Sequence, residues 1–314
     1  MRPEGFSGKE RIIHRMEETK GAFIAIVGRP NVGKSSLLNA FLGEKVAAVS
    51  AKPQTTRTRI TGVLTKGPLQ LVFLDTPGLH QPRSKLAEYM VKQIGESVAD
   101  VDLAVLVTEP LGEIAKAEHD LMQRFQDQGL PAILCINKID LLQNKEAMLA
   151  KIAAFSKEFD YDQVVPVSAL TGDGLDILLE ELGKYAQPGP HFFEDDGLTD
   201  MPEQAVAAEL IREKLLTDLS DEVPHGIAVG IESMKEREDK DLIDIQATIY
   251  CEKESHKGIV IGKNGAMLKR VGIEAREELE RFLDCKVNLQ LWVKVKEDWR
   301  NREGLLRNFG FTEK

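Results

Sequence analysis

Four short motifs in the first 170 residues of the chain carry side chains that can bind phosphate, a metal ion and a base. The first follows an apolar run and precedes a helical stretch, the strand-to-helix context that phosphate binding requires. Its glycines let backbone N–H groups close around phosphates, its lysine can reach the β and γ oxygens, and its serine can bind Mg²⁺. The predicted phosphate loop consists of Gly28, Arg29, Pro30, Asn31, Val32, Gly33, Lys34, Ser35 and Ser36.

The other three motifs also each follow an apolar run. The aspartate of the second motif can hold Mg²⁺ through water, and the N–H of its glycine can contact a γ-phosphate. Because open α/β sheets bind ligands at the carboxyl ends of their strands, we expect all four motifs at one edge of a sheet. The three motifs are Asp75-Thr76-Pro77-Gly78, Asn137-Lys138-Ile139-Asp140 and Ser168-Ala169-Leu170.

The apolar runs that must position these motifs are continuous rather than alternating. Continuous runs are typical of strands that are buried on both faces, as in a parallel sheet covered by helices. Between two of the runs, the stretch 113–129 has apolar residues at helical spacing and ends at Gly129. We therefore predict an α/β domain with a mostly parallel sheet and helices on both faces. The predicted strands cover 22–27, 69–74, 102–107, 131–136 and 163–167.

In this order, the four motifs resemble those of the translation-factor-related P-loop GTPases. The resemblance implies that the domain binds GTP and GDP with Mg²⁺ and hydrolyses GTP. In that family the carboxylate at the position of Asp140 accepts hydrogen bonds from guanine N1 and N2, and the N–H at the position of Ala169 donates to O6. Lys34 and Gly78 would act at the γ-phosphate.

The metal site of this family includes a threonine from a first switch segment. That threonine joins the residues at the positions of Ser35 and Asp75 on Mg²⁺ only when the γ-phosphate is present. The polar segment 53–59, PQTTRTR, lies at the corresponding place in the chain. We favour Thr56 as the ligand, with Thr55 as the alternative, and an ordinary surface loop is the interpretation without function.

The residue after Gly78 bears on the rate of hydrolysis. Many GTPases orient the attacking water with a glutamine at that position, but this chain has Leu79, which cannot form a hydrogen bond. We therefore expect slow intrinsic turnover. Asn31 together with an apolar residue at position 79 resembles the GTPases that place K⁺ near the transferred phosphate, so stimulation by K⁺ is a hypothesis. His80 could act as a base, although a histidine in such a loop is more often solvated.

A segment rich in proline, glycine and aspartate, 186–203, separates this domain from a second one. The second domain has the pattern of a helix, two strands, two helices and an alternating strand, followed by a further helix. This order predicts an α+β fold. The proposed divisions are an N-terminal extension over 1–20, a GTPase domain over 21–187, a linker over 188–202 and the second domain over 203–314.

A glycine loop, I-G-K-N-G, joins the two central helices of the second domain. A GxxG loop lets the backbone approach nucleic-acid phosphates, and apolar residues beside it can receive unstacked bases. In this order of elements the loop resembles that of a type II KH domain, which implies binding of about four nucleotides of single-stranded RNA. A plain glycine turn is the alternative. The predicted RNA contacts are Ile261, Gly262, Lys263, Asn264, Gly265, Lys257, Lys269 and Arg270.

Charge is distributed unevenly along the chain. The net charge is −10, yet the segment 192–222 carries −8 and the segment 253–270 carries +4. We expect RNA to contact the basic segment and the acidic helix to lie away from it. Near the C-terminus, Trp299 could either extend the RNA path by stacking on a base or pack the terminal helix against the domain.

One GTPase domain followed by one type II KH domain resembles a family of bacterial ribosome-assembly GTPases. The resemblance covers about residues 21–300 and includes GRPNVGKSSLLNA, QTTRTR, DTPGLH, NKID and VIGKNG. It implies a GTP-dependent switch that binds the 3′ end of 16S ribosomal RNA and assists 16S rRNA processing and 30S subunit assembly. Two other classes stay open. One is an RNA-binding scaffold with a purely structural nucleotide, and the other is a GTPase attached peripherally to the inner face of the cell membrane.

Composition narrows the class of protein. The chain is 42% hydrophobic and 29% charged, and it contains no apolar run near 18 residues, so we expect no spanning helix. Its three cysteines, Cys135, Cys251 and Cys285, are far apart, which argues against a disulfide framework or a zinc site. The N-terminus has no continuous apolar segment of the secretory type. We therefore expect a protein that acts in the cytoplasm. A monomer is a further expectation, which these features do not decide.

Overall fold

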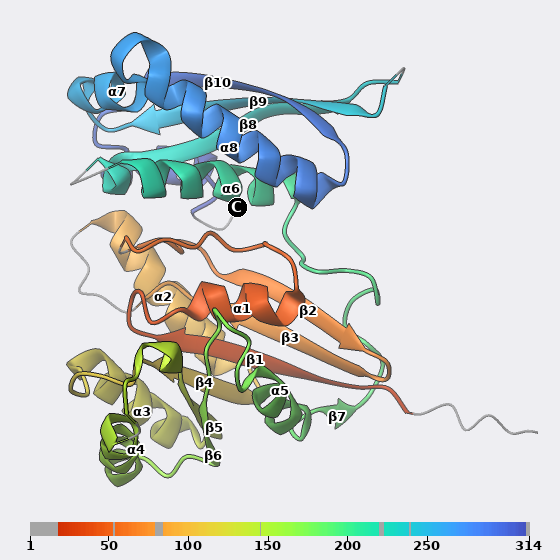
Figure 1. Cartoon of the computed structure of the whole chain (residues 1–314), viewed down its shortest axis with the longest axis vertical. Helices are drawn as coiled ribbons and strands as arrows, with labels where there is room; N and C mark the ends of the chain where they lie inside the picture. Colours follow the sequence, from red (N-terminus) through yellow and green to blue (C-terminus); the bar gives the residue numbers. More distant parts are fainter. Residues whose placement is uncertain are drawn as a thin grey trace, which may run out of the picture.

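The computed structural model describes residues 18–52, 54–78, 84–144, 146–219, 223–238 and 240–311. These residues form two layered units, each built on its own sheet (Figure 1). The strand order in the first sheet is β2-β3-β1-β4-β5-β6, with β7 paired to β1. The strands of this sheet are β1 (Lys20–Gly28), β2 (Ile60–Lys66), β3 (Leu69–Asp75), β4 (Leu103–Thr108), β5 (Ala132–Ile136), β6 (Gln163–Pro166) and β7 (Gln187–Pro188).

The first sheet is mostly parallel, as the continuous apolar runs predict. β2 and β7 are the antiparallel additions, on β3 and β1 respectively. Helices cover both faces, because β1 directs Ile24 and Ile26 into one buried cluster and Ala25 and Val27 into the other. The helices are α1 (Lys34–Leu42), α2 (Lys85–Ala99), α3 (Lys116–Gln128), α4 (Glu146–Glu158) and α5 (Leu175–Gly183), with a 3₁₀ turn η1 (Ile139–Leu141).

The second sheet has the order β10-β9-β8, in which β9 is antiparallel to β8 and parallel to β10. Helices α6 and α8 pack on one face of this sheet (Figure 1). This is the predicted α+β arrangement of a type II KH domain. The strands are β8 (Ile227–Glu236), β9 (Leu242–Cys251) and β10 (Lys286–Val295), and the helices are α6 (Glu203–Asp218), α7 (Glu254–Ile261), α8 (Ala266–Leu283) and α9 (Glu303–Asn308), with 3₁₀ turns η2 (Pro224–Gly226), η3 (Lys263–Gly265) and η4 (Trp299–Asn301).

The segment between the two units is ordered along the edge of the first sheet. Gln70 of β3 accepts hydrogen bonds from the backbone N–H groups of Phe192 and Phe193 at 2.7 and 2.9 Å. Val63 of β2 donates its N–H to the carbonyl of Leu198 at 2.8 Å. A stretch that has no periodicity in sequence is therefore held in place by hydrogen bonds to the strands beside it.

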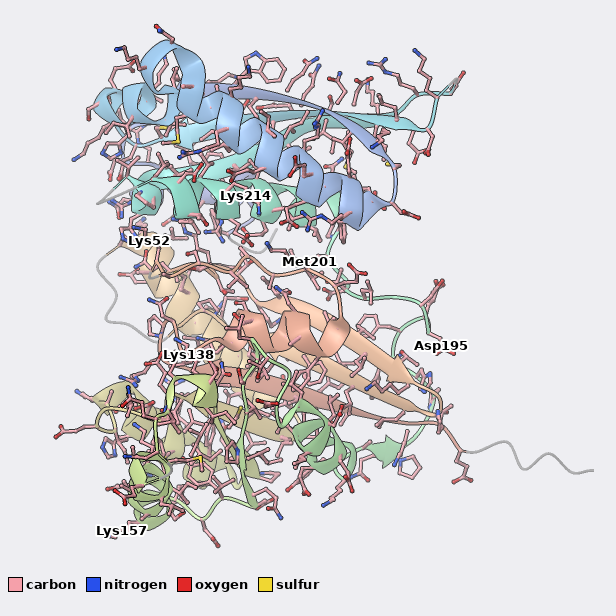
Figure 2. All side chains as sticks on the ribbon, viewed as in Figure 1. Lys52, Lys138, Lys157, Asp195, Met201 and Lys214 are labelled. Carbon is pink, nitrogen blue, oxygen red and sulfur yellow. The ribbon has the colours of Figure 1, made fainter. Side chains whose placement is uncertain are left out.

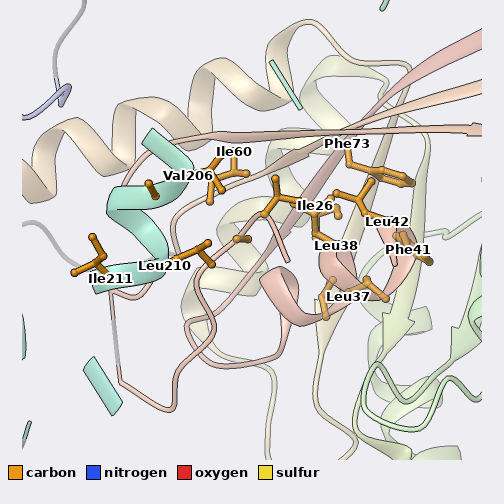
Figure 3. Packing of buried hydrophobic residues seen from close by; sticks show 14 of the residues in the cluster. Ile26, Leu37, Leu38, Phe41, Leu42, Ile60, Phe73, Val206, Leu210 and Ile211 are labelled. Carbon is orange, nitrogen blue, oxygen red and sulfur yellow. The ribbon is translucent and has the colours of Figure 1, made fainter. Parts of the chain in front are cut away.

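The two units also share buried apolar contacts. One cluster contains Ile60 of β2 together with Val206 and Leu210 of α6, and Figure 3 shows these side chains between the two units. A second cluster joins Leu86 of α2 to Trp299, along with neighbours from β8 and the C-terminal segment. No helix within the described ranges is long and apolar enough to cross a membrane.

Candidate nucleotide and RNA sites

The phosphate loop turns between the end of β1 and the start of α1. Gly33 has a φ of 95°, and a Cβ on it would overlap the amide nitrogen of Asn137. Gly78 approaches the loop from β3 so closely that a Cβ there would lie 2.7 Å from the Cα of Pro30. Two of the predicted glycines are therefore required by close packing among the nucleotide motifs themselves.

Three predicted metal ligands meet at one corner of this loop. The Ser35 hydroxyl donates to Asp75 Oδ2 at 2.7 Å and lies 2.8 Å from the Thr56 hydroxyl. Thr56 Oγ1 is 3.4 Å from the same carboxylate oxygen. Thr55 points elsewhere, since its hydroxyl donates to the carbonyl of Lys52 at 2.6 Å. The geometry thus brings Ser35, Thr56 and Asp75 together and leaves Thr55 out.

Burial sets the charges in this corner. It lowers the pKa of Lys34 to about 8, although Asp75 acts in the opposite direction. It also raises the pKa of Asp75 to about 6, while Lys34 and the hydroxyl groups of Ser35 and Thr56 oppose that rise. The Lys34 ammonium donates to the carbonyls of Gly28 and Arg29 at 3.2 and 3.0 Å. A triphosphate placed here would supply the negative charge that this buried lysine lacks.

The same corner fits a magnesium ion. Asp75 Oδ1 is buried and has no hydrogen-bond partner among the described residues. An orphaned carboxylate oxygen beside two hydroxyl groups offers the hard oxygen ligands that Mg²⁺ prefers, directly or through water. Ser35, Thr56 and Asp75 would hold the ion. When bound, Mg²⁺ would neutralise charge on the β- and γ-phosphates.

The base-recognition motifs lie beyond the phosphate loop and are tied to it. Asn137 donates to the carbonyl of Val32 at 2.9 Å and accepts from the N–H of Ala169 at 3.0 Å. Ser168 donates to Asp140 Oδ1 at 2.5 Å, which orients an exposed carboxylate. In this structure the N–H of Ala169, which the resemblance assigns to guanine O6, donates its hydrogen bond to Asn137.

Lys138 also ties the motif that begins at Asn137 to the phosphate loop. Its ammonium donates to the carbonyl of Asn31 at 2.6 Å and pairs with Glu109. Asn31, with a φ of 66°, donates its side-chain amide to the carbonyl of Ala51 at 2.9 Å. The resulting pocket has a volume of about 400 Å³, and its lining includes Val49, Ser50 and Ala51. These three residues follow α1 and carry no motif, so no pattern in the sequence indicates them.

The GxxG loop is shaped by its backbone. Gly262 has φ 72° and ψ 173°, and a Cβ on it would lie 2.6 Å from the Cβ of Met267. Asn264 and Gly265 follow with φ values of 53° and 77°. The loop therefore leaves α7 through a conformation that only glycine adopts readily, and it turns directly into α8.

A groove of about 440 Å³ begins at this loop and runs along α8 toward β10. The sequence predicts Gly265 and Lys269 there, with Leu268 among the apolar residues beside the loop, but Gly272, Ile273, Arg276 and Leu289 were missed. A signal was present, because 268, 272 and 276 recur every fourth position along one side of the helix. The lining consists of Gly265, Leu268, Lys269, Gly272, Ile273, Arg276 and Leu289.

The predicted basic contacts divide into two groups. Arg270 donates to Asp218 of α6 at 2.8 Å, and Lys257 pairs with Glu254 at 3.4 Å. Lys263 and Lys269 are exposed and form no ion pair within the part of the chain that the structure describes. Only this second pair is open to an RNA phosphate without breaking an existing ion pair.

Comparison with known proteins agrees with both sites. The family model for a 50S ribosome-binding GTPase matches residues 23–138, and that for a KH domain matches residues 222–300. The chain is 50% identical to GTPase Era of Ruminiclostridium cellulolyticum over 93% of this chain and 97% of that protein. It is 48% identical to GTPase Era of Clostridioides difficile, over 94% and 99%. The chain belongs to the Era family of GTPases.

Two solved Era structures are similar to this Era-family chain over their whole length. Each has a TM-score of 0.90 and 38% sequence identity, and each match covers 94% of this chain and 100% of the other. One is a variant of Aquifex aeolicus Era bound to GDP and AlF₄⁻. The other is Era in complex with MgGDPNP and nucleotides 1506–1542 of 16S ribosomal RNA. The chain is thus a GTP-hydrolysing enzyme with an RNA-binding KH domain.

The two tryptophans of this Era-family chain occupy opposite environments. Trp299 is fully buried, and its indole N–H donates to the carbonyl of Gly226 at 3.0 Å. The suggestion that Trp299 extends the RNA path is therefore wrong, and its packing alternative is confirmed. Trp292 of β10, which the sequence reasoning did not single out, is 43% exposed. Leu79, His80 and the extension before Glu18 lie outside the described residues.

Proposed function

We propose that this Era-family GTPase binds the 3′ end of 16S ribosomal RNA through its KH domain and assists 16S rRNA processing and 30S subunit biogenesis. The observation that carries the proposal is the full-length similarity to an Era structure that holds MgGDPNP and nucleotides 1506–1542 of 16S ribosomal RNA. The open groove beside the GxxG loop supports it, because single-stranded RNA needs both backbone contacts and an apolar surface for its bases.

We propose the following roles at the nucleotide. Lys34 and the N–H of Gly78 stabilise the γ-phosphate, Ser35, Thr56 and Asp75 hold Mg²⁺, and Asp140 with Ala169 selects guanine. The convergence of the three metal ligands within 3.4 Å supports the second assignment. The exposed, hydrogen-bonded carboxylate of Asp140 supports the third. GTP and GDP with Mg²⁺ are therefore the proposed ligands.

K⁺ stimulation is a separate proposal. Asn31 lies in the phosphate loop next to the carbonyl of Ala51, and amide and carbonyl oxygens are ligands that K⁺ accepts. We expect hydrolysis to be faster in KCl than in NaCl at equal ionic strength. Equal rates in the two salts would remove K⁺ from the mechanism and leave the GTPase assignment untouched.

The domain boundaries, the cellular location and the oligomeric state are also proposals. We place the GTPase domain at 21–187, the linker at 188–202 and the KH domain at 203–314. Since 16S ribosomal RNA is the proposed partner, we expect the protein to act in the cytoplasm. We also propose that it acts as a monomer. Attachment to the inner face of the membrane has less support, because Val271, Ala275 and Leu279 of the amphipathic helix α8 are buried in the core.

The decisive experiment measures the affinity of a short RNA that matches the 3′ end of 16S ribosomal RNA. The full chain is loaded first with a non-hydrolysable GTP analogue and then with GDP. A preference of about tenfold for the GTP form, equivalent to about 1.4 kcal/mol, would support a switch. Tight binding without a preference would favour the scaffold with a structural nucleotide, and no binding in either state would refute the RNA assignment.

A further inference from the structure

The two units meet on three consecutive residues of the first switch, Thr55, Thr56 and Arg57. The carbonyl of Thr55 accepts a hydrogen bond from Arg212 of α6. Arg57 donates to the carbonyl of Ile227 at 2.5 Å, at the start of β8. Between these two contacts with the KH unit, Thr56 reaches into the metal corner of its own GTPase unit. The segment that follows α1 runs between α6 and the first sheet, and Lys52 marks its course in Figure 2.

Arg57 is enclosed by the KH unit. Its side chain is 1% exposed, and it also donates to the carbonyls of His225 and Pro224 at 3.1 and 3.4 Å. Its guanidinium carbon lies 5.6 Å from the centroid of the Trp299 ring, within cation–π range. Several carbonyls and an aromatic face thus bind one side chain that belongs to the GTPase unit.

Among the other polar contacts between the units, Arg212 and Glu213 of α6 are also buried, whereas the lysine that pairs with Glu213 and the pair nearer the C-terminus are more exposed. Lys45 pairs with Glu213 at 2.5 Å, and the N–H of Val49 donates to the same carboxylate at 3.0 Å. Lys85 pairs with Glu303 at 2.6 Å, with 48% and 69% of the two side chains exposed. Since exposed pairs contribute little and buried centres dominate an interface, Arg57 and Arg212 are the central contacts.

The arrangement is poorly optimised for stability alone. The Nε of Arg57 and one terminal nitrogen of Arg212 are buried without a hydrogen-bond partner among the described residues. Burial, together with the nearby charge of Arg212, lowers the pKa of Arg57 to about 9, so the group stays charged at neutral pH. A buried charge with an unmet donor lowers the stability of the fold. Its presence here therefore points to a role other than stability.

Chain geometry links the two contacts. Thr55 and Arg57 are both held by the KH unit, and consecutive Cα atoms are about 3.8 Å apart, so Thr56 cannot move far from the metal corner unless one of these two flanking contacts loosens. We propose that Arg57 is a positioning residue whose anchorage in the KH unit holds Thr56 at the magnesium site and transmits the nucleotide state to that unit. The inference rests on the proposed function in one respect: RNA binding is what the nucleotide state would change in the KH unit.

Trp299 itself provides a reporter of this contact. The sequence has two tryptophans, so Trp292→Phe leaves Trp299 as the single indole. We expect the emission of Trp299 to differ between the complexes with Mg²⁺ and a GTP analogue and with Mg²⁺ and GDP. In the Trp292→Phe/Arg57→Met protein the two complexes should give the same emission. Arg59→Met is the matched control, because Arg59 is exposed in the same segment.

A second readout separates positioning from mere stabilisation of the fold. In the Arg57→Met protein, the Mg²⁺ concentration that half-saturates binding of the GTP analogue should rise by about tenfold, because Thr56 is held less firmly at the metal site; this corresponds to about 1.4 kcal/mol. Binding of GDP without Mg²⁺ should not change, and circular dichroism checks that the variant is folded. Arg212→Met, which releases the carbonyl of Thr55, should act in the same direction and replaces Arg57→Met if that variant fails to fold.

Three results would overturn the proposal: a Trp299 emission that does not depend on the nucleotide, a difference that persists in Arg57→Met, or an unchanged Mg²⁺ requirement. Neither readout uses RNA. A failure of the unsubstituted chain to bind the 16S fragment would therefore refute the proposed function while leaving the role of Arg57 standing. Conversely, if the chain binds the fragment but gives one of the three results above, the role of Arg57 is refuted and the proposed function stands.

Discussion

The nucleotide pocket and the GxxG groove are built in different ways. In the pocket, side chains from distant parts of the chain bind one another, as when Asn137 donates to the carbonyl of Val32 across 105 residues. In the groove, the loop acquires its shape from local backbone conformation at Gly262, Asn264 and Gly265. The pocket buries Lys34 and Asp75, whereas Lys263 of the loop and Lys269 of the groove are exposed.

This difference has a physical consequence for recognition. A pocket whose ligating groups are already held by one another loses little entropy when its ligand binds, so each group contributes strongly and specifically. An open groove with free lysines contributes through charge and apolar contact, which are individually weaker. Substitutions in the pocket should therefore have large, all-or-none effects, and those in the groove should have graded ones.

Asp140→Asn should give the largest effect. The substitution removes two hydrogen bonds to a charged acceptor, each contributing about 1.5–3 kcal/mol, so GTP affinity should fall by a factor on the order of 10²–10⁴. The hydrogen bond from Ser168 can persist with the new amide, which keeps the local structure. Xanthosine triphosphate, which presents an acceptor where guanine has an amino group, should bind the variant better than GTP. Competition binding measures both, and GTP affinity within threefold of the unsubstituted protein would contradict the assignment.

Gly262→Ala and Gly265→Ala test whether backbone shape makes the groove. At Gly262 a Cβ would lie 2.6 Å from Met267 in a conformation restricted to glycine, whereas at Gly265 it would meet nothing within 4 Å. We expect the native loop conformation to be destabilised by about 1–3 kcal/mol or more in Gly262→Ala and by about 1–2 kcal/mol in Gly265→Ala. Titration with the 16S fragment measures the resulting loss of RNA affinity, and thermal unfolding measures the loss of stability. GTP hydrolysis without RNA should be unchanged in both, and a loss of hydrolysis would mean that the two regions are not independent.

Asp75→Asn asks whether the pocket sacrifices stability for its metal site. Because burial raises the pKa of Asp75 to about 6, the folded state binds a proton more tightly than the unfolded state does. The ionised carboxylate therefore destabilises the protein above about pH 6, and the penalty disappears as the pH falls toward 4. Without nucleotide and with a chelator, Asp75→Asn should raise the free energy of unfolding by about 1–3 kcal/mol at pH 7.5. Urea unfolding at pH 7.5 and pH 4.5 tests this, since an advantage that does not shrink at the lower pH has another origin.

Much of the fold and of the nucleotide pocket could be predicted because phosphate and base chemistry demand particular residue types at fixed spacings. The five strands predicted for the first domain are present, but β2 was missed, since Gly62 and flanking threonines interrupt its apolar pattern. Trp292 could have been found, because the alternation in β10 puts it on the same side as Gln290 and Lys294.

The interface between the units could not be predicted from local pattern. Arg57 and Arg59 belong to the same short polar segment, yet one is buried and the other exposed. Their difference depends on where the KH unit packs, which no local pattern encodes. The same holds for the acidic helix α6, which was expected only to avoid RNA. Its Glu213 accepts hydrogen bonds from the first unit, so part of its charge serves the contact between units.

The smallest effect is expected from neighbouring cations in the second region. Lys269 lines the groove, whereas Arg270 is bound to Asp218 of α6. Lys269→Ala should weaken RNA binding by about 1 kcal/mol and reduce the dependence of log K on log salt by about 0.7, the value for one phosphate of a single strand. Arg270→Ala should leave that slope unchanged. If Arg270→Ala instead weakened RNA binding as much as Lys269→Ala, RNA would respond to the net charge of the segment and not to the shape of the groove. The pocket and the groove would then differ in their charge and not in how they are built.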